Sequence, residues 1–296
     1  MTDTSVQVGF GFMLDPHLEN KKSPKYYVKR YLERWRGELA GKTVVDVPAG
    51  NGATTEILLE VGAKVKAYDL FPEYFMIDDL ECERADIMKG IPMENESADM
   101  IICQEGIEHF SDQVKTFKEF NRVLKPGGQL LITTPSYSNL AARLSYFLFE
   151  SENSKKMPPN EIDDVWMSDK SLTDEIYYGH IFLVGLQKLR VIGKLCGLKI
   201  DSIEYVRVSK GSALLFPFLY PLIFLYASMM YRKHMRKDKG VDCEAKKAVY
   251  GEQFKINVDP RNLLNRHTFI VFKKEAQSTN VDFRNDQIVK RFDQIM

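Results

Sequence analysis

A glycine-containing turn between two apolar segments is the first feature of this chain with the chemistry of a ligand site. Residues 43–47 (TVVDV) form an apolar run that contains Asp46. The turn 48–52 (PAGNG) leads from it into a second run, 53–59. Glycines in such a turn let a ligand approach the backbone, and the free N–H groups of a helix start attract an anion. Asp69 follows Asp46 by 23 residues, where a carboxylate can accept hydrogen bonds from a ribose diol. Together they predict a nucleoside ligand with an anionic group.

The spacing of the glycines narrows the choice of nucleoside. Gly50 and Gly52 are followed by Ala53, Thr54 and Thr55, so the third glycine of a G-x-G-x-x-G dinucleotide turn is absent. This disfavours an NAD-dependent oxidoreductase. A turn of this composition can also serve structure alone, and that reading stays open at this point.

The elements that must position these residues alternate along the chain. Apolar runs predict strands at residues 43–47, 64–69, 98–103, 129–134, 199–208 and 268–273, with a short one ending near Asp86. Helical spacing predicts helices after Ser23-Pro24, over 53–59, from a Ser111 cap to Leu124, and over 185–196. Strands alternating with helices imply parallel pairing. The predicted fold is α/β, a doubly wound, seven-stranded, mostly parallel sheet.

The composition sets the class of protein and its organisation. The 296 residues carry 41 Lys+Arg and 41 Asp+Glu, so the formal net charge is zero, which disfavours a nucleic-acid partner. Four well-separated cysteines favour reduced thiols in the cytoplasm, and we expect no signal peptide. We divide the chain into a helical cap (1–40), a main domain (41–208 and 266–274) with a lid region (150–184), an insert (209–265), and a tail (275–296) that is either a docking helix or disordered.

Four segments, taken in order, carry a family resemblance. VVDVPAGNG (44–52), AYDLFP (67–72), RADIMKGIPMENESADMIICQEGIEHF (84–110) and RVLKPGGQLLITTP (122–135) resemble the motif series of class I S-adenosylmethionine-dependent methyltransferases. The resemblance covers about residues 40–207 and the last strand. It departs at Pro48, where the family usually has a glycine. It implies a Rossmann-like methyltransferase fold and S-adenosylmethionine as the cofactor.

The resemblance also implies positions for the cofactor. Gly50 and Gly52 would border its methionine moiety, Asp69 would hold the ribose hydroxyls, and Gln104 would line the sulfonium end. Leu70 would flank the adenine, and Asp86 with Ile87 would lie at the adenine edge. The cofactor-binding residues predicted in this way are Asp46, Ala49, Gly50, Asn51, Gly52, Asp69, Leu70, Asp86, Ile87 and Gln104.

The reacting end must hold an acceptor and, where the acceptor is a hydroxyl, remove its proton. His109 and His180 are the candidate bases, since neutral imidazole titrates near working pH, and Glu105 belongs to the same predicted catalytic set. The stretch 105–109 (EGIEH) resembles that of the ubiquinone-biosynthesis O-methyltransferases, where its three polar side chains can bind a divalent metal. The resemblance thus names Glu105, Glu108 and His109 as a metal set, with a catalytic or a structural role as alternatives. His180 would face the acceptor or pin the lid.

An uncharged run of 21 residues, 211–231, lies within the insert and precedes the basic cluster RKHMRKDK (232–239). Its length of about 30 Å as a helix would suffice to cross a bilayer. Pro217 and Pro221 are expected to break the early turns, and no second apolar stretch returns the chain. We therefore predict contact of residues 211–239 with a membrane surface, ahead of a buried or dimer-forming helix and of a true span.

These observations favour an S-adenosylmethionine-dependent methyltransferase, cytoplasmic and peripheral to the inner face of a membrane. Its acceptor would be small and apolar or lipid-linked, with O-methylation favoured over N- or C-methylation. The alternative is a non-catalytic scaffold or partner subunit with the same fold. A nucleic-acid methyltransferase is disfavoured, because no NPPY-type motif for a flipped base is present. The sequence leaves the oligomeric state and the acceptor's identity open.

Overall fold

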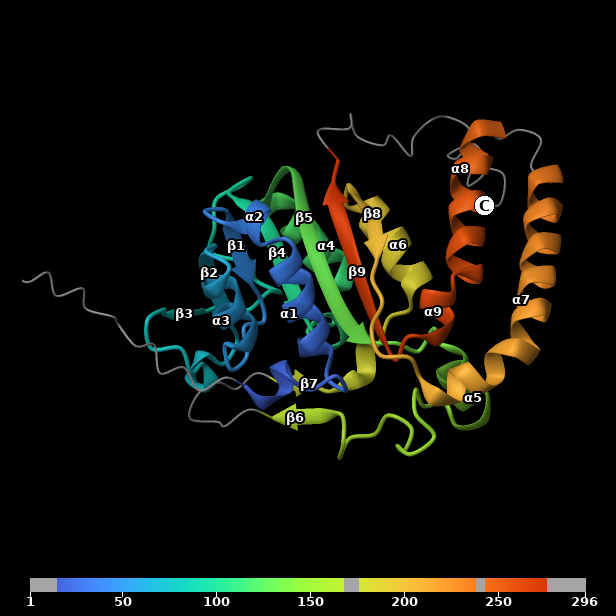
Figure 1. Cartoon of the computed structure of the whole chain (residues 1–296), viewed down its shortest axis with the longest axis horizontal. Coiled ribbons are helices and arrows are strands. Elements are labelled where there is room, and N and C mark those ends of the chain that lie inside the picture. The colour runs from blue at the N-terminus through green and yellow to red at the C-terminus, as the bar shows by residue number, and fades with distance from the viewer. Residues whose placement is uncertain (1–14, 168–175, 238–242, 276–296) are drawn as a thin grey trace, which may run out of the picture.

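The protein is built around one seven-stranded sheet, which the computed structural model describes for residues 15–167, 176–237 and 243–275 (Figure 1). The strands follow the order β3-β2-β1-β4-β5-β9-β8. Pairing is parallel from β3 through β5, whereas β9 runs antiparallel to both neighbours. The predicted α/β, mostly parallel sheet is confirmed. Its strands are β1 (Thr43–Asp46), β2 (Lys64–Asp69), β3 (Cys82–Arg84), β4 (Ala98–Gln104), β5 (Leu124–Pro135), β8 (Leu198–Ile203) and β9 (His267–Lys274).

Helices cover both faces of this sheet, and alternate residues of each strand point to opposite faces. Val44, Ile102 and Val271 pack with α1 (Pro24–Arg34) and α3 (Ala53–Glu60). Val45, Ile101 and Ile270 pack with α4 (Gln113–Val123) and α6 (Leu186–Leu195) on the other face. α2 (Arg36–Leu39) precedes β1, and short 3-10 helices are η1 (Pro16–Leu18), η2 (Pro72–Tyr74), η3 (Ile107–His109) and η4 (His180–Phe182).

Local signals set several of the element boundaries. Ser23 caps α1 as predicted, with Pro24 at its first position. The predicted Ser111 cap of α4 is wrong by one residue, because Asp112 accepts the Lys115 N–H and caps the helix. The predicted lid region (150–184) contains an antiparallel pair of strands, β6 (Val165–Met167) and β7 (Ile176–Tyr178), after α5 (Leu140–Phe149). The predicted tail helix lies outside the described residues.

The insert consists of three helices: α7 (Lys210–Arg236), α8 (Cys243–Val258) and α9 (Pro260–Leu264). The expectation that Pro217 and Pro221 break the early turns is wrong, since both lie within α7. Prolines inside a helix kink it, and Figure 1 shows α7 bending between a first section beside α5 and a longer section beside α8. The insert leaves and rejoins the sheet at one place, where the Ser209 N–H donates to the Leu264 carbonyl at 2.8 Å.

Candidate functional site

The predicted ligand residues gather at one edge of the sheet, where the parallel strands end. Asp46 ends β1, Asp69 ends β2 and Gln104 ends β4, and the register places Asp46 opposite Ala67 and Ile102, each two residues before the end of its strand. Ligands of open α/β sheets bind outside the carboxyl ends of the strands, near the point where the strand order reverses. In this sheet the order reverses between β1 and β4, next to the glycine turn.

The turn itself depends on its glycines. Gly50 and Gly52 have φ of 55° and 88°, the left-handed region that side chains with a Cβ rarely adopt. A Cβ on Gly50 would meet nothing within 4 Å, so open space lies above the turn at this position. A Cβ on Gly52 would lie 2.6 Å from Ile77, because the segment after β2 packs closely on the turn. The turn is therefore shaped for backbone approach at Gly50.

Asp69 holds this turn to the neighbouring strand end. Its Oδ2 accepts the Gly50 N–H at 2.8 Å, and its Oδ1 accepts the Phe71 N–H at 2.8 Å. A carboxylate oxygen has more than one acceptor position, so both oxygens keep capacity for a ribose diol. The Ala49 N–H donates to the Tyr68 carbonyl at 2.9 Å and completes the link between the turn and β2.

The Asn51 side chain is engaged by the N-terminal segment. Its Oδ1 accepts from Lys25 Nζ at 3.1 Å, and its Nδ2 donates to Asp15 Oδ2 at 3.0 Å. Lys25 also pairs with Asp15 at 2.7 Å. Burial raises the pKa of Asp15, but hydrogen bonds from Lys25 and Asn51 outweigh it and bring that pKa to about 2. The sequence did not single out Lys25 or Asp15, which fix the outer side of the turn.

Asp46 is fully buried beneath the turn. Its Oδ2 accepts from the Thr55 hydroxyl at 2.7 Å, while its Oδ1 has no hydrogen-bond partner within the described part of the chain. Burial raises the pKa of this carboxyl to about 7. An unpaired buried oxygen is costly, so this atom is suited to accept from a donor that the fold does not supply.

The predicted adenine side lies beyond β2 and β3. Asp86 Oδ1 accepts the Met88 N–H at 2.9 Å, and its Oδ2 lies 3.2 Å from Lys89 Nζ. Ile87 is buried, and the Leu70 carbonyl accepts from the Arg84 guanidinium. Asp86 thus stabilises its own turn first and has acceptor capacity left for an exocyclic amine.

Gln104 and Glu105 close the other side of the turn. The Thr54 hydroxyl donates to Gln104 Oε1, and Gln104 Nε2 is buried without an acceptor among the described residues. Glu105 has a φ of 48°, and its N–H donates to the Thr133 carbonyl at 2.9 Å. Burial raises the pKa of Glu105 to about 7. The two side chains place one unused donor and one weakly acidic carboxyl at the strand end.

His267 is a neighbour of this site that the sequence analysis missed. It begins β9, opposite Pro135, and its Nε2 lies 3.5 Å from Glu105 Oε2. Burial lowers the pKa of His267 to about 4, so this imidazole is neutral at physiological pH. Because β9 is antiparallel, its first residue reaches the edge where the parallel strands end. The predicted strand began at Thr268, one residue too late to include it.

Glu108, His109 and His180 form a cluster in front of β4. Each offers one potential ligand atom, and these atoms lie within 4.8 Å of one another. The rings of His109 and His180 are 5.7 Å apart between centroids. Gln113 joins the two short helices by donating to the carbonyls of Ile107 and Phe182. The predicted set of Glu105, Glu108 and His109 thus differs from the observed cluster, in which His180 takes the place of Glu105.

The two histidines have different hydrogen-bond partners. His109 Nδ1 lies 2.6 Å from the Tyr178 carbonyl and 3.1 Å from that of Gly179. Carbonyls only accept, so Nδ1 carries a proton and the neutral ring keeps its lone pair on Nε2. Burial lowers the pKa of His109 and favours this neutral form. His180 instead contacts Glu152 of the lid at 3.5 Å, and this contact is the main reason why the pKa of Glu152 falls to about 2.

Residues 45–132 match the family of methyltransferase domains. The chain is 30% identical over 130 residues to the demethylmenaquinone methyltransferase of Chlorobaculum tepidum, covering 42% of this chain and 53% of that protein. It is 32% identical over 108 residues to the ubiquinone biosynthesis O-methyltransferase of Xanthomonas oryzae pv. oryzae, covering 33% and 45%. The chain thus spans about half the length of these curated relatives.

Among solved structures, the chain is similar to an S-adenosylmethionine-dependent methyltransferase from Archaeoglobus fulgidus. The TM-score is 0.49 at 14% identity, with 87% of this chain and 97% of that chain covered. The matched residues 45–132 include the glycine turn, Asp69, Asp86 and the cluster from Gln104 to His109.

Proposed function

We propose that this chain, which belongs to the class I S-adenosylmethionine-dependent methyltransferase family, transfers the methyl group of that cofactor to a small apolar acceptor. The observation that carries the proposal is the meeting, at one sheet edge, of a glycine turn, a row of strand-end acids and a neutral imidazole. The first two suit a nucleoside with a charged tail, and the third suits removal of a proton. We assign cofactor binding to the residues predicted from the sequence, except that Asn51 acts through the N-terminal network.

The residues at the edge fit this cofactor. Its sulfonium supplies an electrophilic methyl group when the cofactor is bound. The unpaired oxygen of Asp46 and the unpaired Nε2 of Gln104 offer an acceptor and a donor for the amino-acid portion, and Asp69 offers acceptors for the ribose. Gly50 leaves space for close approach.

His109 is the proposed general base. Its Nε2 lone pair takes the proton from an acceptor hydroxyl while the hydroxyl oxygen displaces the sulfur from the methyl carbon. Glu105 and His180 line the same space and orient the acceptor. The proximity of the reacting atoms supplies much of the rate, because the displacement requires an in-line approach.

A divalent metal at Glu108, His109 and His180 is the second use of the same cluster. Both oxygens of Glu108 are buried without a hydrogen-bond partner within the described segments, and each of the three residues offers one potential ligand atom within 4.8 Å of the others. Carboxylate and imidazole together suit zinc or manganese. Dialysis against a chelator followed by metal add-back separates the two uses, since a base needs no metal.

We propose an acceptor related to a quinone precursor, because two relatives that match the chain are named for quinone methylation. Such acceptors are apolar, which agrees with an enzyme that works at a membrane surface on the cytoplasmic side. O-methylation is favoured because a base is in place for a hydroxyl.

The helix α7 supports the membrane part of the proposal. Of the described helices it alone is long and apolar enough to cross a bilayer, with a mean hydropathy of 1.8 over its 18-residue window, only 6% of which is buried. The insert leaves and rejoins the sheet at the Ser209–Leu264 contact, so its two ends must lie on the same side of a membrane. A single crossing would place them on opposite sides. Contact in the plane of the membrane avoids this conflict.

An apolar surface on α5 and α7 would make that contact. It consists of Leu144, Phe147, Leu148, Leu214, Phe218, Leu225 and Met229, all exposed. The spacing along α7 places its four members on one side of the helix. Exposed cations follow at the end of α7, where they suit anionic head groups: Arg232, Lys233, Arg236 and Lys237.

The decisive experiment incubates the purified chain with methyl-labelled cofactor and a short-chain catechol precursor of a quinone. We expect label in the acceptor, and loss of that label in His109→Ala. Calorimetric titration with S-adenosylhomocysteine tests the alternative of a non-catalytic scaffold. A chain that takes up no heat and transfers no label would be such a scaffold.

A further inference from the structure

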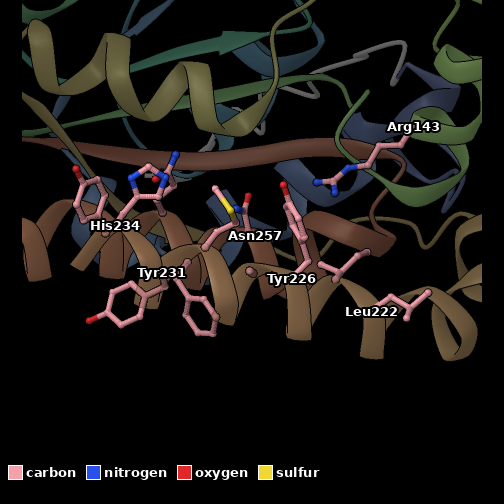
Figure 2. Close-up of a pocket in the computed structure, with 12 residues that line it drawn as sticks. Arg143, Leu222, Tyr226, Tyr231, His234 and Asn257 are labelled. Atoms are coloured by element: carbon pink, nitrogen blue, oxygen red, sulfur yellow. The ribbon is translucent and has the colours of Figure 1, made fainter. Parts of the chain in front are cut away.

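A groove of about 580 Å³ lies between α7 and α8, apart from the glycine turn and the histidine cluster. Its walls are mostly aliphatic and aromatic, and Figure 2 shows Leu222, Tyr226, Tyr231 and His234 spaced along one long helix. It is lined by Arg143, Leu222, Ile223, Tyr226, Ala227, Met230, Tyr231, His234, Tyr250, Gln253, Phe254 and Asn257. Its volume lies in the range of pockets that hold small ligands.

The two walls are joined to each other by aromatic contacts and fixed to the rest of the fold by polar ones. Phe254 of α8 packs against Phe224 and Tyr231 of α7, with ring centroids 5.8 Å away in each case. On its far side α8 is fixed to α6, where Glu252 pairs with Arg190 at 3.2 Å. Lys246 Nζ donates to the Lys237 carbonyl at 2.9 Å and joins the start of α8 to the end of α7. The groove is therefore a feature of a braced helix pair.

The groove is long and narrow. Its lining on α7 runs from Leu222 to His234, twelve residues apart, which is about 18 Å along a helix. One leaflet of a bilayer core of about 30 Å is roughly 15 Å deep, and a single lipid chain spans that depth. The length of the groove thus matches one extended hydrocarbon chain.

Arg143 gives the groove one charged end. It belongs to α5 and projects toward α7 near Leu222 and Tyr226, as Figure 2 shows, while His234 lies at the opposite end. Within the described part of the chain the Arg143 guanidinium has no carboxylate or other acceptor. The residue is exposed to solvent, and the protein beside it desolvates the guanidinium only in part, which lowers its pKa. A cation at the open end of an apolar groove, with no counter-ion among the described residues, favours a ligand that carries an anionic end group.

We propose that this groove binds a monomeric single-chain lipid anion, with its hydrocarbon chain along α7 and its carboxylate on Arg143. The groove lies on the side of α7 opposite the apolar surface of α5 and α7, since Ile223, Ala227 and Met230 alternate with Phe218, Leu225 and Met229 around the helix. One face of the helix thus takes a single lipid and the other takes the membrane. The binding needs no methyl transfer and is measured without cofactor.

The test uses the full chain and two probes that differ only in the end group, tetradecanoate and tetradecan-1-ol, both as monomers. Native mass spectrometry and calorimetry should show one site, with the carboxylate bound about tenfold more tightly than the alcohol. In Arg143→Gln the two probes should bind equally. In Ala227→Trp, which fills the middle of the groove, neither should bind.

Matched variants outside the groove control for general effects. Lys255→Gln removes an exposed cation of α8, and Val249→Trp adds the same bulk on the exposed side of α8; both should bind as the parent does. Binding of S-adenosylhomocysteine should be unchanged in Arg143→Gln and Ala227→Trp, which shows that they fold. Equal affinity for the two probes in the parent, binding that survives Ala227→Trp, or no binding because residues 276–296 or a second copy already fill the groove would each overturn the proposal. Loss of methyl transfer alone would leave it standing.

Discussion

The ring of Pro48 packs against the backbone of Gly106 at the sheet edge and leaves no room there for a Cβ. A Cβ added to Gly106 would lie 2.7 Å from Cγ of Pro48 and 3.1 Å from the Cys103 sulfur. Pro48 stands where class I methyltransferases usually have a glycine, and its ring fills a position that a Cβ at residue 106 would otherwise take. The departure in the glycine turn is thus accommodated by a glycine 58 residues later in the chain.

This contact predicts coupling between two substitutions. Gly106→Ala should destabilise the fold by about 1–3 kcal/mol, because an overpacked core side chain must displace its neighbours. Pro48→Gly should remove most of the clash, so that the double variant is more stable than the sum of the single effects predicts. Urea denaturation of the four proteins measures the coupling. Strict additivity would mean that the two residues do not meet.

Asp46 predicts an unusual pH dependence of stability. Its pKa is about 7 in the folded chain and about 3.9 in an unfolded one, so between these values the folded state holds a proton that the unfolded state has lost. The free energy of unfolding therefore falls as the pH rises through this window, by up to about 4 kcal/mol. Asp46→Asn keeps an acceptor for Thr55 and should be the more stable protein at pH 8, with the advantage gone near pH 4.

The matched control for Asp46→Asn is Asp79→Asn, an exposed acid in the loop after β2. It should leave the pH profile of urea unfolding unchanged. Asp46→Asn should also weaken binding of S-adenosylhomocysteine, since the proposed acceptor for its amino group loses its charge. Unchanged pH dependence in Asp46→Asn would assign the titration to another group.

The role of His109 predicts a particular pH profile of activity. A base must be deprotonated, and burial lowers the pKa of His109 below its usual value near 6.5. The decline of methyl transfer that comes from protonating His109 should therefore lie at a pH below 6.5, lower than for a free imidazole. His109→Gln should reduce kcat by about a hundredfold or more with little change in cofactor affinity. His17→Gln, an exposed histidine of η1, is the control, and an equal loss in both variants would contradict the assignment.

The sequence predicted the sheet and its carboxyl edge because the signals are local. Apolar runs and the glycine turn mark β1, β2, β4 and the strand ends directly, and the structure confirms them. No local signal places His267 at this edge, because its position depends on the antiparallel pairing of β9 with β5. The same holds for the grouping of His180 with Glu108 and His109, which requires the paired strands β6 and β7 to bring residues more than 70 positions apart into contact.

Helix α7 was mispredicted for a physical reason of a different kind. Two prolines at a spacing of four ordinarily break a helix, yet Pro217 and Pro221 bend it while α5 supports the first section. The Ser212 hydroxyl accepts the Ala141 N–H at 3.0 Å and donates to Asn139 Oδ1 at 2.9 Å. Such tertiary contacts offset the backbone hydrogen bonds that the prolines remove, and no local sequence pattern predicts them.

The apolar surface of α5 and α7 gives the last prediction. Phe218→Glu with Leu225→Glu places two charges on the side of α7 that faces away from the groove, so binding to vesicles containing anionic lipid should fall at least tenfold in a sedimentation assay. Arg232→Gln with Lys233→Gln should weaken binding to anionic vesicles and leave weak binding to neutral ones, because the cations act through head-group charge. The control is Lys64→Glu with Lys66→Glu on exposed positions of β2, remote from the insert. S-adenosylhomocysteine should bind all of these proteins equally. A parent chain that stays in the supernatant with both kinds of vesicle would contradict membrane docking while leaving the glycine turn and the histidine cluster as the methyl-transfer site.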